Sequence, residues 1–502
     1  MRNIQADIAI IGGSLGGVQA ARAACARGHS VYLCEETDWI GGQMTAQAVP
    51  PDEHQWIEQQ GATKSYMDYR RKVRETYLAM PDASEEMKAQ KELCPGQCWV
   101  SRVSHDPRIG VRLLTESLQP YLDSGLLTLE LRTVCVDAQV EGDCVKQVTV
   151  RSVETGEECT VTAKYFLDGT DCGDLLPLTG TEYALGAESR AETGEPDAPE
   201  TGDGEDMQPI TWVAALELTP ERIPMEKPAL YDEFAAMGVA YADNKLLSWY
   251  GPEAATGTKR LFTMYSEPGV LGLWDYRRIQ YPPYFTTPKN EITLLNWPQN
   301  DFTESGVIDV PDREEKLYRA RQQTLSLAYW LWEQGYNIRL CPEVTDTPDG
   351  LAKAPYIRES RRIKARRTIR EQDVIKACQP EPKRWHDSVG VGHYNMDLHQ
   401  TIKTHSFFFA PVTPFEIPLG ALIPIRMKNL LPSCKNIGTT HLTGGCYRLH
   451  PVEWNIGESA GTLAAYCVEH GVTPAEVWEN EEHLHAYQQV LEDQGVQLHW
   501  DL

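Results

Sequence analysis

The chain has 502 residues, of which 41% are hydrophobic and 24% charged, and its net charge is −25. This length exceeds one ordinary core and predicts two or three domains. The acidic balance argues against a nucleic-acid partner, because nothing supplies the cations that a phosphate backbone attracts. No apolar run reaches the roughly 18 residues of a membrane span. An apolar strand that begins near Asp7 leaves no room for a signal peptide.

The 13 cysteines are odd in number and scattered, unlike a disulfide framework. We therefore expect a cytoplasmic protein. Cys94 and Cys98 flank Pro-Gly-Gln, a spacing that fits neither a zinc knuckle nor a thioredoxin-like pair. No histidines share the spacing of metal ligands on one helix, so no metal site is expected.

The first fifty residues predict a nucleotide-binding unit. An apolar strand over 7–11 ends in the glycine-rich run 12–17, an alanine-rich helix follows, and a second strand ends at Glu35. The glycines permit a tight turn and close helix packing, and free amides at the helix start would face a pyrophosphate. Glu35 is placed to accept hydrogen bonds from a ribose hydroxyl. The predicted cofactor contacts here are Gly12, Ser14, Leu15, Gly16 and Glu35.

A glycine pair follows at 41–42. The segment 36–45 resembles the one that follows the acidic residue in flavoproteins of the glutathione-reductase type. In that type, paired glycines let the backbone pass close beneath the flavin and its phosphates. The resemblance implies FAD rather than NAD, with contacts from Gly41, Gly42, Gln43 and Met44.

Residues 126–163 alternate apolar and polar side chains and predict an antiparallel meander with strands over 126–142, 143–153 and 158–163. The apolar strand after it ends in a glycine- and aspartate-rich turn and looks like the return strand of an FAD domain, which reaches the adenosine. In such proteins the preceding strand touches the adenine by its backbone. The implied contacts are Val134, Gly169, Thr170 and Asp171.

The C-terminal part carries a matching signature. Residues 429–432 resemble a final sheet strand, and a glycine–alanine helix follows at 455–465. With its N-terminus near the flavin, that helix would stabilise negative charge on the reduced ring. The alternative is a tightly packed helix that binds nothing. The predicted contacts are Asn436, Gly457, Ser459, Ala460 and Gly461.

Together these segments resemble, from end to end, the FAD-dependent oxidoreductases related to the fumarate reductase and succinate dehydrogenase flavoproteins. The run 357–362 belongs to the resemblance. It implies an α/β fold with a discontinuous Rossmann-like FAD-binding domain and a mixed α+β substrate-binding cap. The expected FAD-binding segments are 1–50, 100–180 and 400–475, the cap is mostly 181–399, 51–99 is a helical insertion and 476–502 a C-terminal helical tail.

Three features describe the expected cap. The acidic stretch 186–206 predicts an exposed loop with little packed structure. Residues 312–335 have helical spacing, with a buried stripe that includes Leu317, Leu325 and Leu331. The aromatic clusters near 249 and 281 could line a pocket or form the core of a sheet.

Three clusters are candidates for substrate chemistry. The arginines of 358–362 could contact an anion or form an ion-pair network. In the stretch 392–399, either histidine could act as a base if it faces the flavin. A third cluster precedes the flavin-facing helix, where a histidine and an arginine could bind an oxygen anion and handle a proton. The predicted catalytic residues are His441, Arg448, His393 and His450.

These features predict an FAD-dependent oxidoreductase that transfers a hydride between flavin N5 and a small organic substrate, at a CH–OH, CH–NH or CH–CH bond. A single glycine fingerprint is present, so electrons would come from or go to oxygen, a quinone, a carrier protein or the substrate itself. The alternatives are a flavin-dependent monooxygenase or halogenase, whose late Gly-Asp turn is not seen, and a flavin-binding partner protein without catalysis.

Overall fold

The computed structural model describes residues 2–502. Its centre is a parallel sheet with strand order β23-β8-β2-β3-β4, so strands from both ends of the chain lie side by side. Their bounds are β2 Ile8–Ile11, β3 Val31–Glu35, β4 Leu127–Leu131, β8 Tyr165–Asp168 and β23 Leu430–Pro432. The predicted Rossmann-like sheet, including its return strand and its final strand, is confirmed.

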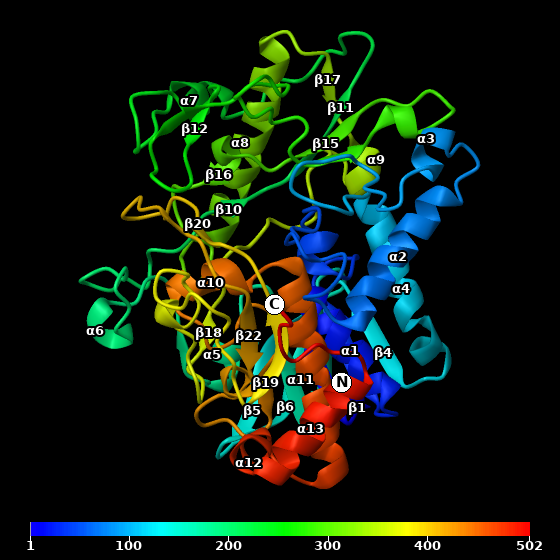
Figure 1. The fold of residues 1–502 in the computed structure, drawn as a ribbon, viewed down its shortest axis with the longest axis vertical. Coiled ribbons are helices and arrows are strands. Elements are labelled where there is room, and N and C mark those ends of the chain that lie inside the picture. Colours follow the sequence, from blue (N-terminus) through cyan, green and yellow to red (C-terminus); the bar gives the residue numbers. More distant parts are fainter. Residues whose placement is uncertain (1) are drawn as a thin grey trace.

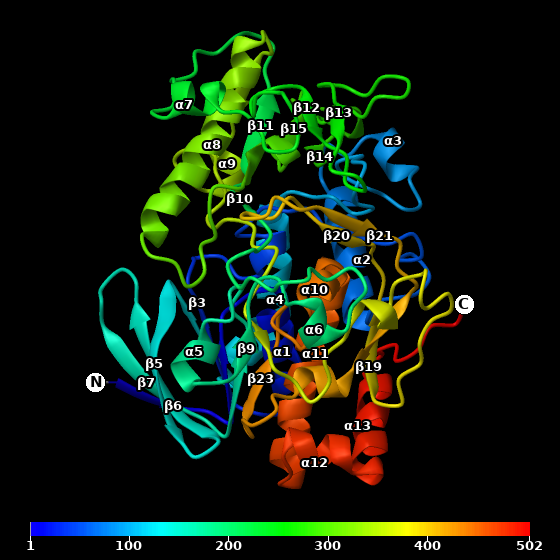
Figure 2. The same cartoon turned by 90° about the vertical axis from the view of Figure 1, so that its left-hand side faces the viewer.

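Two glycine-rich helices cross at close range beside this sheet. Helices α1 (Leu15–Ala26) and α11 (His450–His470) lie next to each other in both views (Figures 1 and 2). A Cβ atom on Gly457 would lie 2.0 Å from the carbonyl oxygen of Gly16, and one on Gly461 would lie 2.2 Å from that of Ala20. Such separations are possible only for glycine, so these residues set how closely the helices approach.

A second sheet has the order β1-β7-β6-β5. Its strands are β1 Arg2–Gln5, β5 Thr133–Glu141, β6 Cys144–Ser152 and β7 Glu158–Thr162. The antiparallel pairing of β5, β6 and β7 confirms the meander. The single strand predicted over 126–142 is wrong, because Arg132 has φ 52° and separates β4, in the parallel sheet, from β5. Strand β1, parallel to β7, was not predicted.

The cap forms the upper part of the molecule in Figures 1 and 2. Its antiparallel sheet has the order β14-β15-β11-β17, and α8 (Arg313–Glu333) packs against it. The strands are β11 Ala214–Leu218, β14 Arg278–Gln280, β15 Ile292–Leu295 and β17 Ile338–Leu340. The helix predicted over 312–335 is confirmed; Leu317 and Leu331 are buried, whereas Leu325 is half-buried.

The helices α2 Lys64–Leu78, α3 Glu85–Lys88 and α4 Pro107–Asp123 follow β3, so the helical region extends past the predicted insertion. The other helices are α5 Leu175–Thr179, α6 Arg190–Thr193, α7 Tyr231–Ala236, α9 Pro342–Thr345, α10 His441–Tyr447, α12 Pro474–Glu479 and α13 Glu481–Asp493. Short 3-10 helices are η1 Gly42–Met44, η2 Pro282–Tyr284, η3 Pro298–Asn300, η4 Glu371–Asp373 and η5 Leu419–Leu422. Among residues 2–502, no helix combines the length and the apolar character needed to cross a bilayer.

The remaining strands are short: β9 Tyr183–Ala184, β10 Ile210–Thr211, β12 Tyr250–Pro252, β13 Lys259–Leu261, β16 Asp301–Phe302, β18 Arg362–Ile363, β19 Ser388–Gly392, β20 Met396–Leu398, β21 Phe408–Ala410 and β22 Phe415–Pro418. The acidic stretch 186–206 is more ordered than predicted. Glu195 in it is buried, and its carboxylate accepts hydrogen bonds from Thr440 Oγ1 at 2.7 Å and from the Glu371 amide at 2.7 Å.

The helix crossing generates a stability prediction. We expect Gly457→Ala to lower the free energy of unfolding by about 1–3 kcal/mol, because the added methyl group overpacks a backbone contact. Gly444→Ala in α10 is the matched control, since the nearest atom to its added Cβ lies 3.9 Å away. This control should leave the protein unchanged or more stable by up to about 1 kcal/mol. Urea denaturation measures both; equal values would contradict the packing role of Gly457.

Candidate active site

The turn between β2 and α1 is built from backbone packed against backbone. Gly12 has φ 95°, and a Cβ on it would lie 2.4 Å from the carbonyl carbon of Gly169. Ser14 caps the helix, its Oγ accepting a hydrogen bond from the Gly17 amide at 3.2 Å. A Cβ on Gly17 would lie 2.1 Å from the carbonyl oxygen of Gly12. The turn therefore requires glycine at these positions and brings the ends of β2 and β8 together.

A cavity opens at this edge of the sheet. Seven of the residues predicted to contact the cofactor line it together: Gly12, Glu35, Gly42, Val134, Gly169, Thr170 and Asp171. The Glu35 carboxylate accepts hydrogen bonds from the amides of Gly13 and Thr37, each at 2.9 Å. Burial raises the pKa of Glu35 to about 7, against the lowering effect of the bonds from Thr37. An acidic acceptor beside exposed backbone fits an adenosine, whose ribose offers hydroxyl donors.

The Gly41–Gly42 turn lies against the same loop. Both glycines have positive φ, 107° and 47°, and a Cβ on Gly42 would lie 3.0 Å from Ser14 Cα. Gln43 is fully buried and its Nε2 donates to the Arg448 carbonyl at 3.0 Å and to Glu453 Oε2 at 2.5 Å. Of the predicted contacts, Leu15 and Met44 have side chains in the hydrophobic core.

Five predicted cofactor residues have other partners. Asn436 Nδ2 donates to the Asp168 carbonyl at 3.1 Å, and Ser459 Oγ donates to the Val389 carbonyl at 2.8 Å. Ala460 is buried in the core, and Gly457 and Gly461 face α1. Their place at the cofactor stays a prediction. Helix α11 begins earlier than expected, and the Gly16 amide donates to Glu453 Oε1 at 3.1 Å from its first turn.

A second cavity, of about 450 Å³, lies where the cap meets the β20–β21 hairpin. Its charged lining residues are Asp52, Glu53, Arg260, Arg277, Asp301, Asp397 and His399, and its aromatic lining residues are Trp99, Phe262, Tyr276, Trp297, Tyr394, Phe407 and Phe409. The size and the mixture of apolar walls with a few polar groups suit a small organic molecule. Of the clusters near 249 and 281, only Pro252 lines this cavity, and Tyr284 lies in the hydrophobic core.

Arg448 contacts a segment at each cavity: Gln43 follows Gly42 of the nucleotide cavity, and Asp397 lines the second cavity. Its Nη1 donates to Tyr356 Oη at 2.7 Å and its Nη2 to the Asp397 carbonyl at 3.2 Å, while its own carbonyl accepts from Gln43. Burial lowers the pKa of Arg448, but Tyr356 and Asp397 outweigh burial and the net shift is upward. Its guanidinium therefore stays charged beside a residue that lines the second cavity.

His450 lies directly behind this cavity. Its Nδ1 accepts from the Asp52 amide at 3.1 Å, which leaves the Nε2 hydrogen to be donated to the Val49 carbonyl, also at 3.1 Å. Burial lowers the pKa of His450 to about 4. The ring is thus neutral, with both nitrogens engaged, and it holds the backbone on which Asp52 is carried.

His441 and His393 lie outside the residues that line either cavity. His441 Nδ1 is 3.0 Å from both carboxylate oxygens of Glu359, and Arg362 bonds to the same carboxylate. His393 Nε2 is 3.1 Å from the Val412 carbonyl, and its ring packs edge-on against Trp56 at 4.9 Å between centroids. The nearer histidine is His399, which lines the second cavity and whose Nδ1 is 2.6 Å from Asp301 Oδ2.

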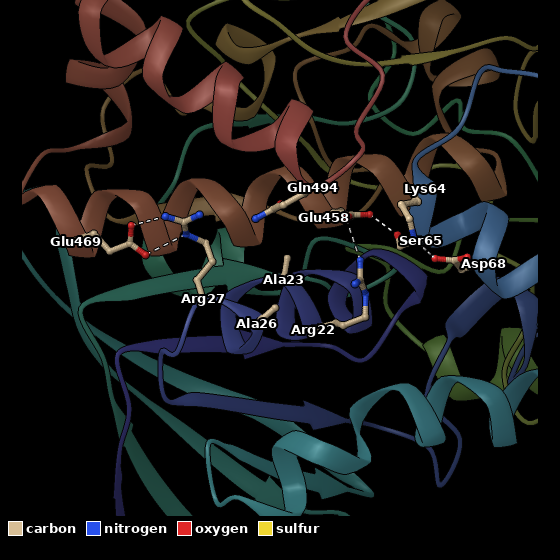
Figure 3. Close-up of a pocket in the computed structure, with 10 residues that line it drawn as sticks. All are labelled: Arg22, Ala23, Ala26, Arg27, Lys64, Ser65, Asp68, Glu458, Glu469 and Gln494. Carbon is tan, nitrogen blue, oxygen red and sulfur yellow. Dashed lines mark hydrogen bonds and ion pairs between the residues drawn. The ribbon is translucent and has the colours of Figure 1, made fainter.

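A third hollow lies on the surface of α1 and α11 (Figure 3). Its charged side chains pair with one another: Arg22 with Glu458 at 2.9 Å, Arg27 Nε with Glu469 at 2.9 Å, and Lys64 with Asp68 at 2.5 Å. Because these charges are already matched, the hollow offers no unpaired charge to a ligand.

The Glu359 cluster generates a prediction about stability and pH. Glu359→Gln should lower the free energy of unfolding by about 3–5 kcal/mol near pH 6, because it leaves buried cations without their counter-charge. His441 and Arg362 hold the pKa of Glu359 at about 2 although burial raises it, so this stabilisation is lost as pH falls below about 4.5. Burial lowers the pKa of His441, but Glu359 outweighs burial and the net shift is upward. The stabilisation that protonated His441 contributes is therefore lost as pH rises through its raised pKa.

Urea denaturation from pH 3 to 8 would measure this difference. Glu75→Gln is the control, since its pair with Arg71 is exposed and worth about 1 kcal/mol or less. If Glu359→Gln and Glu75→Gln changed the free energy of unfolding equally at every pH, the buried cluster around Glu359 would not stabilise the fold.

Comparisons with known proteins agree with the geometry. A 48-residue segment is 48% identical to N,N-dimethylglycine/sarcosine dehydrogenase of Chromohalobacter salexigens, covering 10% of this chain and 7% of that protein. Similar solved structures include the quinol fumarate reductase FrdA of E. coli (13% identity, TM-score 0.33, covering 98% of this chain and 74% of that one) and the p-nitrophenol 4-monooxygenase PnpA of Pseudomonas putida (9%, 0.38, 99% and 88%).

The myxobacterial chondrochloren halogenase CndH is similar at 12% identity and a TM-score of 0.35, covering 98% of this chain and 84% of that one. Residues 7–491 match the family of FAD dependent oxidoreductases. Since this match spans nearly the whole chain, the protein belongs to the FAD-dependent oxidoreductase family, and FAD is its cofactor.

Proposed function

We propose that this oxidoreductase transfers a hydride between FAD and a small organic molecule bound in the cavity between the cap and the β20–β21 hairpin. The observation that carries the proposal is the course of residues 42–52, which begin at the nucleotide cavity and end at the second one. Gly42 lines the nucleotide cavity and Asp52 lines the second one, and Arg448 spans from Gln43 to Asp397. A substrate in the second cavity would therefore adjoin the segment on which a flavin would lie.

The nucleotide cavity fits FAD. Glu35 would accept hydrogen bonds from the ribose, the backbone of Val134 would meet the adenine edge, and the turn at Gly12 would face the phosphates. Bound there, FAD supplies a two-electron acceptor or donor. No second nucleotide fold is needed for substrate oxidation if oxygen, a quinone or a carrier protein takes the electrons.

The protein's own groups prepare the substrate side. Arg277 forms a buried ion pair with Asp52, Nη1 to Oδ1 at 3.2 Å, so both are fixed at the cavity wall. Burial lowers the pKa of Arg277 and Asp52 raises it, with a net upward shift, so this charge is permanent. Arg448 holds the Asp397 carbonyl in place. These groups would orient a polar substrate while the aromatic walls exclude water.

Membership in an oxidoreductase family sets aside the alternative of a flavin-binding partner without catalysis. A monooxygenase or halogenase remains a different outcome of the same experiment, because such an enzyme would consume oxygen and would not be reduced stoichiometrically by its substrate.

The direct test is anaerobic. We expect purified FAD-loaded protein to lose its visible flavin absorbance when mixed with one class among alcohols, amines and organic acids, with oxygen restoring the colour. The matched control is heat-denatured protein with the same free FAD. Reduction by dithionite alone, with no organic donor effective and with labelled oxygen entering a product, would replace this proposal by a monooxygenase.

The nucleotide contact has its own prediction. Glu35→Gln should weaken FAD binding about tenfold, because a neutral amide replaces a carboxylate acceptor and loses about 1.4 kcal/mol. Titration of apoprotein with FAD, followed by quenching of flavin fluorescence, measures the affinity. Glu157→Gln, in an exposed turn, should bind as the wild type does. If the wild type and both variants bound FAD with equal affinity, Glu35 would not be a cofactor contact.

A further inference from the structure

His399 and Asp301 form a hydrogen-bonded pair in the wall of the second cavity. His399 directly follows β20, and Asp301 begins β16, so the pair joins the hairpin to the cap. Asp301 is a hydrogen-bond acceptor when ionised, so the hydrogen at the 2.6 Å contact belongs to His399 Nδ1. In a neutral ring this leaves the lone pair on Nε2, and the side chain is 29% exposed at the cavity.

Asp301 is held rigidly as a carboxylate. Its Oδ1 accepts from Thr211 Oγ1 at 2.5 Å and from Arg358 Nη2 at 2.9 Å. Arg358 is itself fixed, because its Nη1 donates to the Pro209 carbonyl at 2.9 Å. Burial raises the pKa of Asp301, but Arg358 and His399 outweigh it and the net shift is downward. A buried, ionised carboxylate on Nδ1 orients the imidazole and stabilises it when Nε2 takes up a proton.

Three further residues of the same cavity indicate which hydrogen-bonding groups a ligand would carry. Asn296, Trp297 and Arg277 line it, and their donor atoms Nδ2, Nε1 and Nε are buried without a hydrogen-bond partner among residues 2–502. Buried donors are nearly always paired. Three such donors beside aromatic walls favour a ligand with several acceptor oxygens.

From this geometry we infer that His399 is the catalytic base for oxidation of an alcohol that carries further acceptor oxygens, such as a carboxylate or additional hydroxyls. The inference rests on the function proposed above. The alcohol O–H bond breaks and its proton goes to His399 Nε2; the C–H bond breaks and its hydrogen leaves with the electron pair to FAD; the carbon–oxygen bond becomes a carbonyl. Oxygen, a quinone or a carrier protein then takes the two electrons.

The chemistry separates an alcohol from the other substrate classes. A neutral amine that loses a hydride leaves a stable iminium, so no base is needed in that step. An alcohol that loses a hydride would leave a strongly acidic protonated carbonyl, so a positioned base lowers the barrier. The acceptor oxygens of the substrate would receive hydrogen bonds from the three unpartnered donors. Trp297 and Asn296 would supply uncharged donors, and Arg277 a charged one.

Two carboxylates lie beside the ring of His399. Asp397 Oδ2 is 3.9 Å from Nε2, and Asp301 lies on the opposite nitrogen. The other charged groups at the cavity are paired: Asp52 with Arg277, and Arg260 with Glu253. Glu53 pairs with Arg70. Two carboxylates therefore lie within 4 Å of the imidazole nitrogens, and the other charged groups of the cavity have partners of their own.

The test uses FAD-loaded protein and the alcohols that bleach it. We expect His399→Gln to slow anaerobic flavin reduction about 100-fold or more, with little change in KM, and to abolish the rise of the rate with pH. Asp301→Asn should slow it less and shift the pH profile. Trp297→Phe keeps the ring and removes one donor, so it should raise KM about tenfold and leave the pH profile unchanged. His386→Gln, at an exposed site, should behave as the wild type.

A second measurement needs no turnover. Protein labelled with ¹⁵N-histidine should show one Nδ1–H resonance that His399→Gln removes and Asp301→Asn shifts to the other tautomer. If amines alone bleached the flavin, or if His399→Gln kept the wild-type rate and pH profile, the inference would be overturned while the proposed function stood. If no organic donor bleached the flavin, both the inference about His399 and the proposed function would be wrong, whichever tautomer His399 adopts.

Discussion

The nucleotide cavity of this protein depends on the close backbone contact at the turn between β2 and α1. The carbonyl of Ser433 approaches Gly16 so closely that a Cβ would lie 1.8 Å from it, and Gly457 meets Gly16 from the other helix. On the far side of the turn, Gly12 abuts Gly169. Segments from the beginning, the middle and the end of the chain thus converge where side chains have no room. The nucleotide cavity is the space left at that point.

The two cavities follow different physical rules. The nucleotide cavity depends on glycines and main-chain atoms, which any sequence with the same turn would present. The second cavity depends on charged side chains held by partners in other segments. The arginines of 358–362 show how this is done, since each has its own carboxylate: Arg358 has Asp301, Arg361 has Asp309 at 2.7 Å, and Arg362 has Glu188 at 2.8 Å. One short stretch thereby ties the cap, the return-strand turn and α10 together.

This difference explains what the sequence could predict. The nucleotide half follows local patterns, so the first strand–turn–helix–strand unit with Glu35 and the meander could be inferred from spacing. The return strand and the final strand of the parallel sheet came from the family resemblance. The glycines of α11 serve the helix crossing, and their pattern alone does not separate that role from a cofactor contact, because small residues suit both. The break at Arg132 has no local signature. His399 was visible as one of two candidate histidines, but its partner Asp301 is nearly 100 residues earlier and meets it only through the tertiary fold.

The helix crossing also bears on how the protein is made. Gly16 and Gly457 are 441 residues apart, and at about 5–20 residues per second a ribosome needs roughly 20–90 s to synthesise the chain between them. During that time the glycine- and alanine-rich face of α1 lacks the helix that covers it. Strand β8 likewise lacks its neighbour β23. The nascent N-terminal half therefore stays incomplete, with this apolar surface uncovered, until the last part of the chain has been made.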